Sequence, residues 1–183
     1  LFQPAEEGPP TGEEGGASLM IKEGALENPK VDVVFGLHML SLLPSGQLGY
    51  RSEGIMAAVD GLKIKVVGRG AHGATPWDSK DPIMIASQII NGLQTIVSRQ
   101  TDLTKAPAVI TIGSFHSGNR GNIIPETAEL EGTIRTFDVG MQKALHQKIK
   151  LTAEKIAESA GATAVVDIKI GSPVTYNDAK LTA

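Results

Sequence analysis

The chain contains no cysteine, few aromatic residues (one Trp, two Tyr and four Phe) and no long hydrophobic run. Without cysteine, no disulfide can form within these 183 residues. No apolar run reaches the roughly 18 residues that a membrane-spanning helix needs, and no basic-then-apolar signal sequence opens the chain. We therefore expect a soluble, cytoplasmic protein with no membrane partner.

The chain also lacks a large excess of charge of one sign, since the formal net charge is only −3. No basic stripe alternates with aromatic residues, so nucleic acid and acidic membranes are not expected partners. Hydrophobic residues make up 41% and charged residues 20%, as in ordinary globular domains. Acidic residues outnumber basic ones by eight to three in residues 1–57, which suits a cation-binding portion.

Two adjacent glutamates, Glu6 and Glu7, follow an apolar start and precede a glycine-rich stretch. Neighbouring carboxylates repel each other unless a cation or a shared proton relieves the repulsion. The pair therefore indicates a metal site with a general base beside it. A solvated acidic turn is the ordinary alternative for such a dipeptide.

His38 ends a run of β-branched and aromatic residues at 31–35, which predicts a strand. Residues 15–26 before it predict a short helix that a glycine ends. Parallel strands of an open α/β sheet bring their carboxyl ends to the same edge, so Glu6, Glu7 and His38 can converge there. A hydrogen-bonded structural histidine is the alternative to a metal ligand.

From about residue 57 the pattern changes to that of a second, self-contained unit. Residues 62–66 alternate between polar and apolar, which is typical of a half-buried strand. Asp81 and Pro82 begin a helix whose apolar residues recur at helical spacing. Its apolar face comprises Ala86, Ile89, Ile90, Leu93, Ile96 and Val97.

Two strands are then predicted at 109–115 and 128–137, followed by a second amphipathic helix and a last strand at 164–170. The apolar face of this helix comprises Met141, Leu145, Ile149, Ile156 and Ala160, and Gly161 ends it. The order strand, helix, strand, strand, helix, strand predicts a ferredoxin-like βαββαβ arrangement, with helices on one face of an antiparallel sheet. Its free edges invite pairing across a two-fold axis.

Five polar residues of this unit deserve separate interpretation. His72 lies among small residues that let a substrate approach the backbone, although an exposed loop histidine fits equally. Asn122 lies on a glycine-flanked turn, where asparagine is common for its own backbone contacts. Arg135 lies off the core face of its strand, where it can grip a carboxylate or form a cross-strand salt bridge with a glutamate. His116 and His146 are interpreted as structural or solvated, the second on the exposed side of its helix.

Five motifs occur in order along the chain. They are Phe2-Gln3-Pro4-Ala5-Glu6-Glu7-Gly8, Gly36-Leu37-His38, Gly68-Arg69-Gly70-Ala71-His72-Gly73-Ala74 followed by Pro76, Gly121-Asn122-Ile123-Ile124-Pro125, and Gly132-Thr133-Ile134-Arg135-Thr136-Phe137. Together they resemble the co-catalytic metallopeptidase and aminoacylase superfamily, in its branch of hippurate, N-acyl-amino-acid and indole-acetyl-amino-acid amidohydrolases. The resemblance covers nearly the whole chain. It implies an α/β fold: part of a metallopeptidase-type catalytic domain with an inserted ferredoxin-like lid.

The resemblance implies metal-dependent hydrolysis of the amide bond of N-acyl amino acids. It implies that Glu6 is the general base and that Glu7 and His38 are ligands of a divalent metal pair. Carboxylate and imidazole ligands suit zinc, manganese, cobalt or nickel.

For the lid, the resemblance implies that His72 and Asn122 stabilise the oxyanion of the attacked amide. Because substrates of this branch carry a free carboxylate, Arg135 becomes a candidate to bind it. In such enzymes the help from the lid crosses to the neighbouring subunit, which implies a homodimer formed through the lid.

The chain departs from the family because the upstream ligands (a cysteine, a histidine and an aspartate) and a histidine near the C-terminus are not in it. We therefore expect an internal piece, with a partial catalytic domain at 1–57, the lid at 58–172 and a return to the catalytic domain at 173–183. Two metal ligands are too few for a tight site, so we expect this piece alone to be inactive. The alternatives are a sister-branch metallopeptidase acting on a dipeptide or N-succinyl substrate and, for the isolated piece, a dimerisation module without chemistry.

Overall fold

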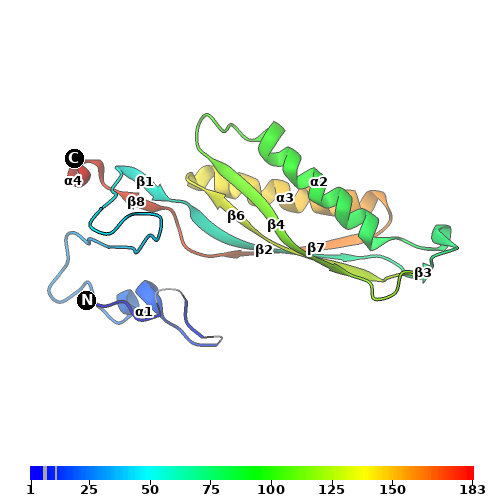
Figure 1. Ribbon diagram of the computed structural model, residues 1–183, viewed down its shortest axis with the longest axis horizontal. Coiled ribbons are helices and arrows are strands. Elements are labelled where there is room, and N and C mark those ends of the chain that lie inside the picture. Colours follow the sequence, from blue (N-terminus) through cyan, green and yellow to red (C-terminus); the bar gives the residue numbers. More distant parts are fainter. Residues whose placement is uncertain (6–7, 11) are drawn as a thin grey trace. The chain divides into compact units, whose positions relative to one another are not determined.

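The computed structural model describes residues 1–5, 8–10 and 12–183. The chain divides into two compact units, Leu1–Leu48 and Gly49–Ala183. Figure 1 shows the course of the chain through the helices and strands of each unit. No helix among the described residues is long and apolar enough to cross a membrane.

The first unit contains the predicted short helix, α1, at Gly16–Lys22. The helix ends as a Schellman motif, because the Ala25 N–H donates to the Met20 carbonyl at 2.9 Å and the Gly24 N–H donates to the Ile21 carbonyl at 3.0 Å. Gly24 has φ of 85°, a left-handed conformation that glycine adopts without a steric penalty. The expected terminator is therefore confirmed, although the helix is shorter than residues 15–26.

The strand predicted at residues 31–35 is wrong, because the structure has no strand there. Val34 and Phe35 are 68% and 82% exposed. A strand needs a neighbour to accept and donate its backbone hydrogen bonds, and no strand of the first unit's described residues lies beside this segment. The β-branched composition alone does not hold it in a sheet.

The second unit is built on a four-stranded antiparallel sheet with strand order β4-β6-β2-β7. Its strands are β2 Ala58–Val67, β4 Ala108–Ser117, β6 Thr127–Thr136 and β7 Thr163–Ile170. Two short antiparallel pairs accompany it. One joins β1 Glu53–Met56 to β8 Thr175–Asn177, and the other joins β3 Ala71–His72 to β5 Ile123–Ile124.

Helices α2 (Pro82–Gln100) and α3 (Val139–Ser159) cover the same face of the four-stranded sheet (Figure 1). The element order β2-α2-β4-β6-α3-β7 confirms the predicted βαββαβ arrangement. Short helices η1 (Pro76–Asp78) and α4 (Ala179–Thr182) complete the unit. The expected helix start is also confirmed, because the Asp81 carboxylate accepts the Ile83 N–H at 2.9 Å.

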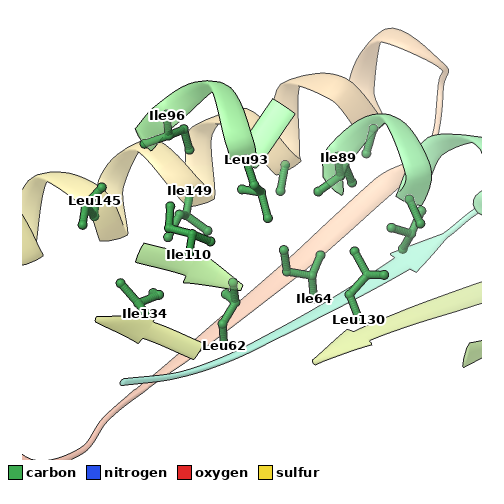
Figure 2. Close-up of a cluster of buried hydrophobic side chains, with 14 of the residues drawn as sticks. Leu62, Ile64, Ile89, Leu93, Ile96, Ile110, Leu130, Ile134, Leu145 and Ile149 are labelled. Atoms are coloured by element: carbon green, nitrogen blue, oxygen red, sulfur yellow. The ribbon is translucent and has the colours of Figure 1, made fainter. Parts of the chain in front are cut away.

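The core lies between the two helices and the sheet (Figure 2). Leu62, Ile64, Ile89, Leu93, Ile96, Leu130, Ile134, Leu145 and Ile149 are at most 1% exposed. Burial of each such side chain contributes about 1.5–3 kcal/mol of transfer free energy. This one core fixes the strands that carry Arg135 and lead to His72.

The opposite face of the sheet is open and carries alternating charges. Lys63 pairs with Glu131 at 2.8 Å, and Lys65 pairs with Glu129 at 3.0 Å. The hydrogen bond and charge of Glu131 raise the pKa of Lys63, and Lys63 lowers the pKa of Glu131 in return. These exposed pairs set the polar character of the face more than its stability.

Candidate functional site

The β3–β5 pair brings His72 and Asn122 to neighbouring strand ends. Ala71 lies opposite Ile124, and His72 lies opposite Ile123. One residue further, the Gly73 N–H donates to the Asn122 carbonyl at 2.8 Å. Two of the predicted functional residues, fifty positions apart in sequence, therefore share one small, exposed loop cluster.

Two glycines permit this close approach. A Cβ atom at Gly70 would lie 2.9 Å from the Ile124 carbonyl oxygen, and one at Gly73 would lie 3.1 Å from the Asn122 carbonyl oxygen. Any side chain at these positions would push β3 and β5 apart. The small residues around His72 thus serve the pairing of two backbone segments.

The imidazole of His72 has a defined hydrogen-bonding direction. The Ala74 N–H donates to His72 Nδ1 at 3.1 Å, so Nδ1 acts as an acceptor. In the neutral ring the proton then lies on Nε2, which makes Nε2–H a donor. The side chain is exposed, so this donor is accessible to a ligand.

Arg135 lies on the open face of the sheet at the far end of β6. Its cross-strand neighbours are Val59 and Val109. Among the described residues no ion pair involves Arg135, and the glutamates of β6 pair with Lys63 and Lys65. The cross-strand salt bridge considered from the sequence is therefore not formed.

The structure separates Arg135 from the His72–Asn122 cluster. Arg135 lies opposite Val59, near the start of β2, whereas His72 follows the end of β2 at Val67. Eight residues of strand at about 3.3 Å each span about 26 Å. An acyl amino acid is much shorter than this, so one small molecule cannot contact both places on the same chain.

The candidate metal residues lie in the first unit. Glu6 and Glu7 fall outside the described residues, and His38 is exposed in a segment without regular secondary structure. Within the part of the chain that the structure describes, no group of three His, Cys, Asp or Glu side chains could hold a metal ion.

One polar cluster was missed from the sequence. Asp60, only 1% exposed, pairs through Oδ2 with His146 Nε2 at 2.7 Å. The expectation that His146 lies on the exposed side of its helix is wrong, since its side chain is only 19% exposed. A signal was present, because Asp60 shares the alternation of Leu62 and Ile64 and so falls on the core face of β2. His116, by contrast, is exposed, as expected.

Comparison with known proteins gives a consistent family. Residues 58–163 match the peptidase dimerisation domain. The N-acetyl-L-cysteine deacetylase of Bacillus subtilis is 38% identical over all of this chain and 42% of its own length. The hippurate hydrolase of Campylobacter jejuni is 37% identical over 97% of this chain and 45% of its own length.

A solved structure agrees with these relatives. The YxeP protein of Bacillus subtilis, described as a dinuclear metal binding peptidase from the M20 family, has a TM-score of 0.70 and 33% identity. The match covers 91% of this chain and 40% of that protein. The chain thus spans less than half the length of the relatives it matches. It belongs to the M20 peptidase family, and residues 58–163 form the peptidase dimerisation domain of that family.

Proposed function

We propose that the protein containing this chain is a metal-dependent amidohydrolase. It hydrolyses the amide bond of N-acyl amino acids, including hippurate-like substrates, and releases a carboxylate and an amino acid. The observation that carries the proposal is the accessible Nε2–H donor of His72, fixed by the Ala74 N–H and adjacent to Asn122. The relatives named as a deacetylase and a hippurate hydrolase support the same chemistry.

In this proposal the lid supplies charge stabilisation. His72 Nε2–H and the Asn122 side-chain amide donate to the oxygen that becomes negative when the amide carbon is attacked. Removal of one such donor from a preorganised site costs about 10²–10³ in kcat. A neutral imidazole suffices as the donor.

The general base and two of the metal ligands come from the N-terminal residues Glu6, Glu7 and His38. Glu6 takes a proton from the attacking water and passes it to the leaving amine. Glu7 and His38, a carboxylate and an imidazole, have the chemistry to bind zinc, manganese, cobalt or nickel together with ligands from outside these 183 residues. When bound, a divalent metal pair supplies an acidified water and polarises the amide carbonyl.

Arg135 binds the free carboxylate of the substrate through two parallel hydrogen bonds. Within one copy, about 26 Å of strand separates Arg135 from His72, so these two residues of the same copy serve different active sites. We therefore propose a homodimer, formed through an outer edge of the four-stranded sheet, in which His72 and Asn122 of one copy complete the site of the other. The matched dimerisation domain supports this assembly.

The proposal also covers the domains of the full-length protein and its location. Residues 1–57 and 173–183 belong to a catalytic domain, residues 58–172 form a lid inserted in it, and the enzyme acts in the cytoplasm. Alone, the 183-residue chain acts as a dimerisation module without turnover, because the metal ligands are incomplete.

A sister activity, hydrolysis of a dipeptide or an N-succinyl substrate, is the second candidate. It is favoured by the description of the similar YxeP structure as a peptidase. The two activities differ in the acyl group, which is an aminoacyl or succinyl group in the sister activity and a simple acyl group, such as the benzoyl group of hippurate, in the first.

The test is hydrolysis of a panel of N-acyl amino acids and dipeptides by the full-length protein, supplied first with manganese and then with zinc. We expect turnover of the N-acyl amino acids by the full-length protein and none by residues 1–183. Glu6→Gln is expected to abolish turnover while metal content stays at the wild-type level. Turnover of dipeptides alone would favour the sister activity, and near-native turnover by Glu6→Gln would refute the general base.

A further inference from the structure

Asp60 is a carboxylate placed where the fold otherwise buries apolar side chains. On the core face of the sheet it lies between Ile134 of β6 and Ile170 of β7. Among the described residues only Asp60 and Thr136 are polar and buried. A buried carboxylate is tolerated only where donors replace its water, so its partners indicate what the residue does.

The first two partners lie on α3. Gln142 Nε2 and His146 Nε2 each lie 2.7 Å from Asp60 Oδ2. Residues four apart on a helix lie on the same face, so both donors come from one turn of α3. This turn is thereby held against β2.

The third partner lies where the chain leaves the sheet. The Gly171 N–H, which follows β7, lies 3.3 Å from Asp60 Oδ1 and also donates to the Val59 carbonyl at 3.0 Å. In return the Val59 N–H donates to the Ser172 carbonyl at 2.9 Å. A Cβ atom at Gly171 would lie 2.3 Å from the Val59 oxygen, so only glycine allows this crossing.

We call residues 57–59 and 171–173 the elbow. Through the elbow the chain passes between the four-stranded sheet and the β1–β8 pair, once in each direction (Figure 1). The two sheets share no strand pairing in the described residues, and the chain passes between them at the elbow. Phe137, which follows β6, also lies against β1, since a Cβ atom at Gly54 would lie 2.9 Å from its ring. The direction of the β1–β8 pair therefore depends on the elbow together with this contact.

We infer that the Asp60 carboxylate is a positioning group that locks the elbow. One oxygen holds α3 and the other holds Gly171, so the seating of the helix and the exit direction of the chain are coupled through one side chain. The inference concerns the second unit alone and stands whether or not the proposed hydrolysis is correct.

The test uses the complete 183-residue chain, whose lack of cysteine allows specific spin labelling. Labels at Val165→Cys on β7 and Tyr176→Cys on β8, both exposed positions, report the distance across the elbow. Asp60→Asn keeps the shape of the side chain but turns one acceptor into a donor that faces two donors. We expect it to broaden the distance distribution and to raise amide exchange at Gly171 by about tenfold or more, relative to Ile134 in β6.

Further variants separate locking from general destabilisation. Gln142→Met, on the partly exposed helix surface, removes one donor and is expected to broaden the distribution even if Asp60→Asn fails to fold. His146→Gln retains a donor and is expected to behave like the parent, as is His116→Gln on the opposite face. Unchanged distributions in folded Asp60→Asn and Gln142→Met would overturn the inference. Exchange that rises equally at Gly171 and Ile134 would overturn it as well.

Discussion

The backbone N–H of Ala74 donates a hydrogen bond to Nδ1 of His72 at 3.1 Å. This contact assigns the proton of the neutral ring to Nε2 and leaves Nε2–H as the donor. The Gly73 N–H simultaneously holds the Asn122 carbonyl at 2.8 Å. A three-residue segment thus both orients the imidazole and positions the neighbouring asparagine.

Gly73→Ala is expected to displace β5, because the new methyl group would lie 3.1 Å from the Asn122 oxygen. In the full-length enzyme, kcat/KM for an N-acyl amino acid should fall by about 10- to 100-fold, since small misplacements of catalytic groups are costly. Gly113→Ala is the matched control, because no atom lies within 4 Å of its Cβ position. Equal activities of the two variants would show that the spacing of β3 and β5 is unimportant for catalysis.

Arg135→Met in the full-length enzyme is expected to raise KM for N-acyl amino acids by about 10- to 100-fold, because two charge-assisted hydrogen bonds are lost. The corresponding methyl esters lack the carboxylate, so their KM should be little changed. Lys63→Met, on the same open face but paired with Glu131, serves as the control. If acids and esters respond alike to Arg135→Met, the arginine does not bind the substrate carboxylate.

Much of the second unit was predictable because its signals are local. The Asp81 cap and the apolar stripe of α2 are predicted from residues close together in the sequence, and both are present in the structure. The β3–β5 pairing was not predictable, because two-residue strands fifty positions apart carry no periodic pattern. The structure places the Asn122 carbonyl against the Gly73 N–H, next to His72, and separates both residues from Arg135.

Two sequence-based predictions were wrong because they concern residues whose structure depends on partners elsewhere in the chain. Residues 31–35 have strand composition, but a strand depends on a neighbour that supplies hydrogen bonds. Sequence spacing within α3 predicts an exposed His146, whereas Asp60, 86 positions away, pairs with its ring. Alternation along β2 did place Asp60 on the core face, so a buried partner could have been sought.

The second unit should lose stability at acidic pH because Asp138, whose carboxylate caps the N-terminus of α3, becomes protonated. Its carboxylate accepts the Met141 N–H at 2.6 Å and lies 3.3 Å from Lys105, and these contacts lower its pKa below the ordinary 3.8. Because the pKa of Asp138 is lower in the folded state than in the unfolded state, the ionised carboxylate stabilises the folded state at pH values above the unfolded-state pKa. This stabilisation is lost as pH falls through the folded-state pKa. The melting temperature of the wild type should therefore lose its advantage over Asp138→Asn as pH falls from about 5 to about 2.

Asparagine also caps helices, so Asp138→Asn keeps the cap and removes only the charge. A difference in melting temperature between the two proteins that stays constant over this pH range would contradict the assignment.

The most direct test of the account mixes two full-length variants, His72→Ala and Arg135→Ala, under conditions that allow subunit exchange. At a substrate concentration well below the wild-type KM, each variant alone is expected to be nearly inactive. In a mixed dimer, one site receives an intact Arg135 from its own copy and an intact His72 from the other. With random exchange, about one quarter of the wild-type activity should return. If mixing restores no activity although mixed dimers form, His72 and Arg135 do not serve one site from two copies, and the proposed assembly of the active site is wrong.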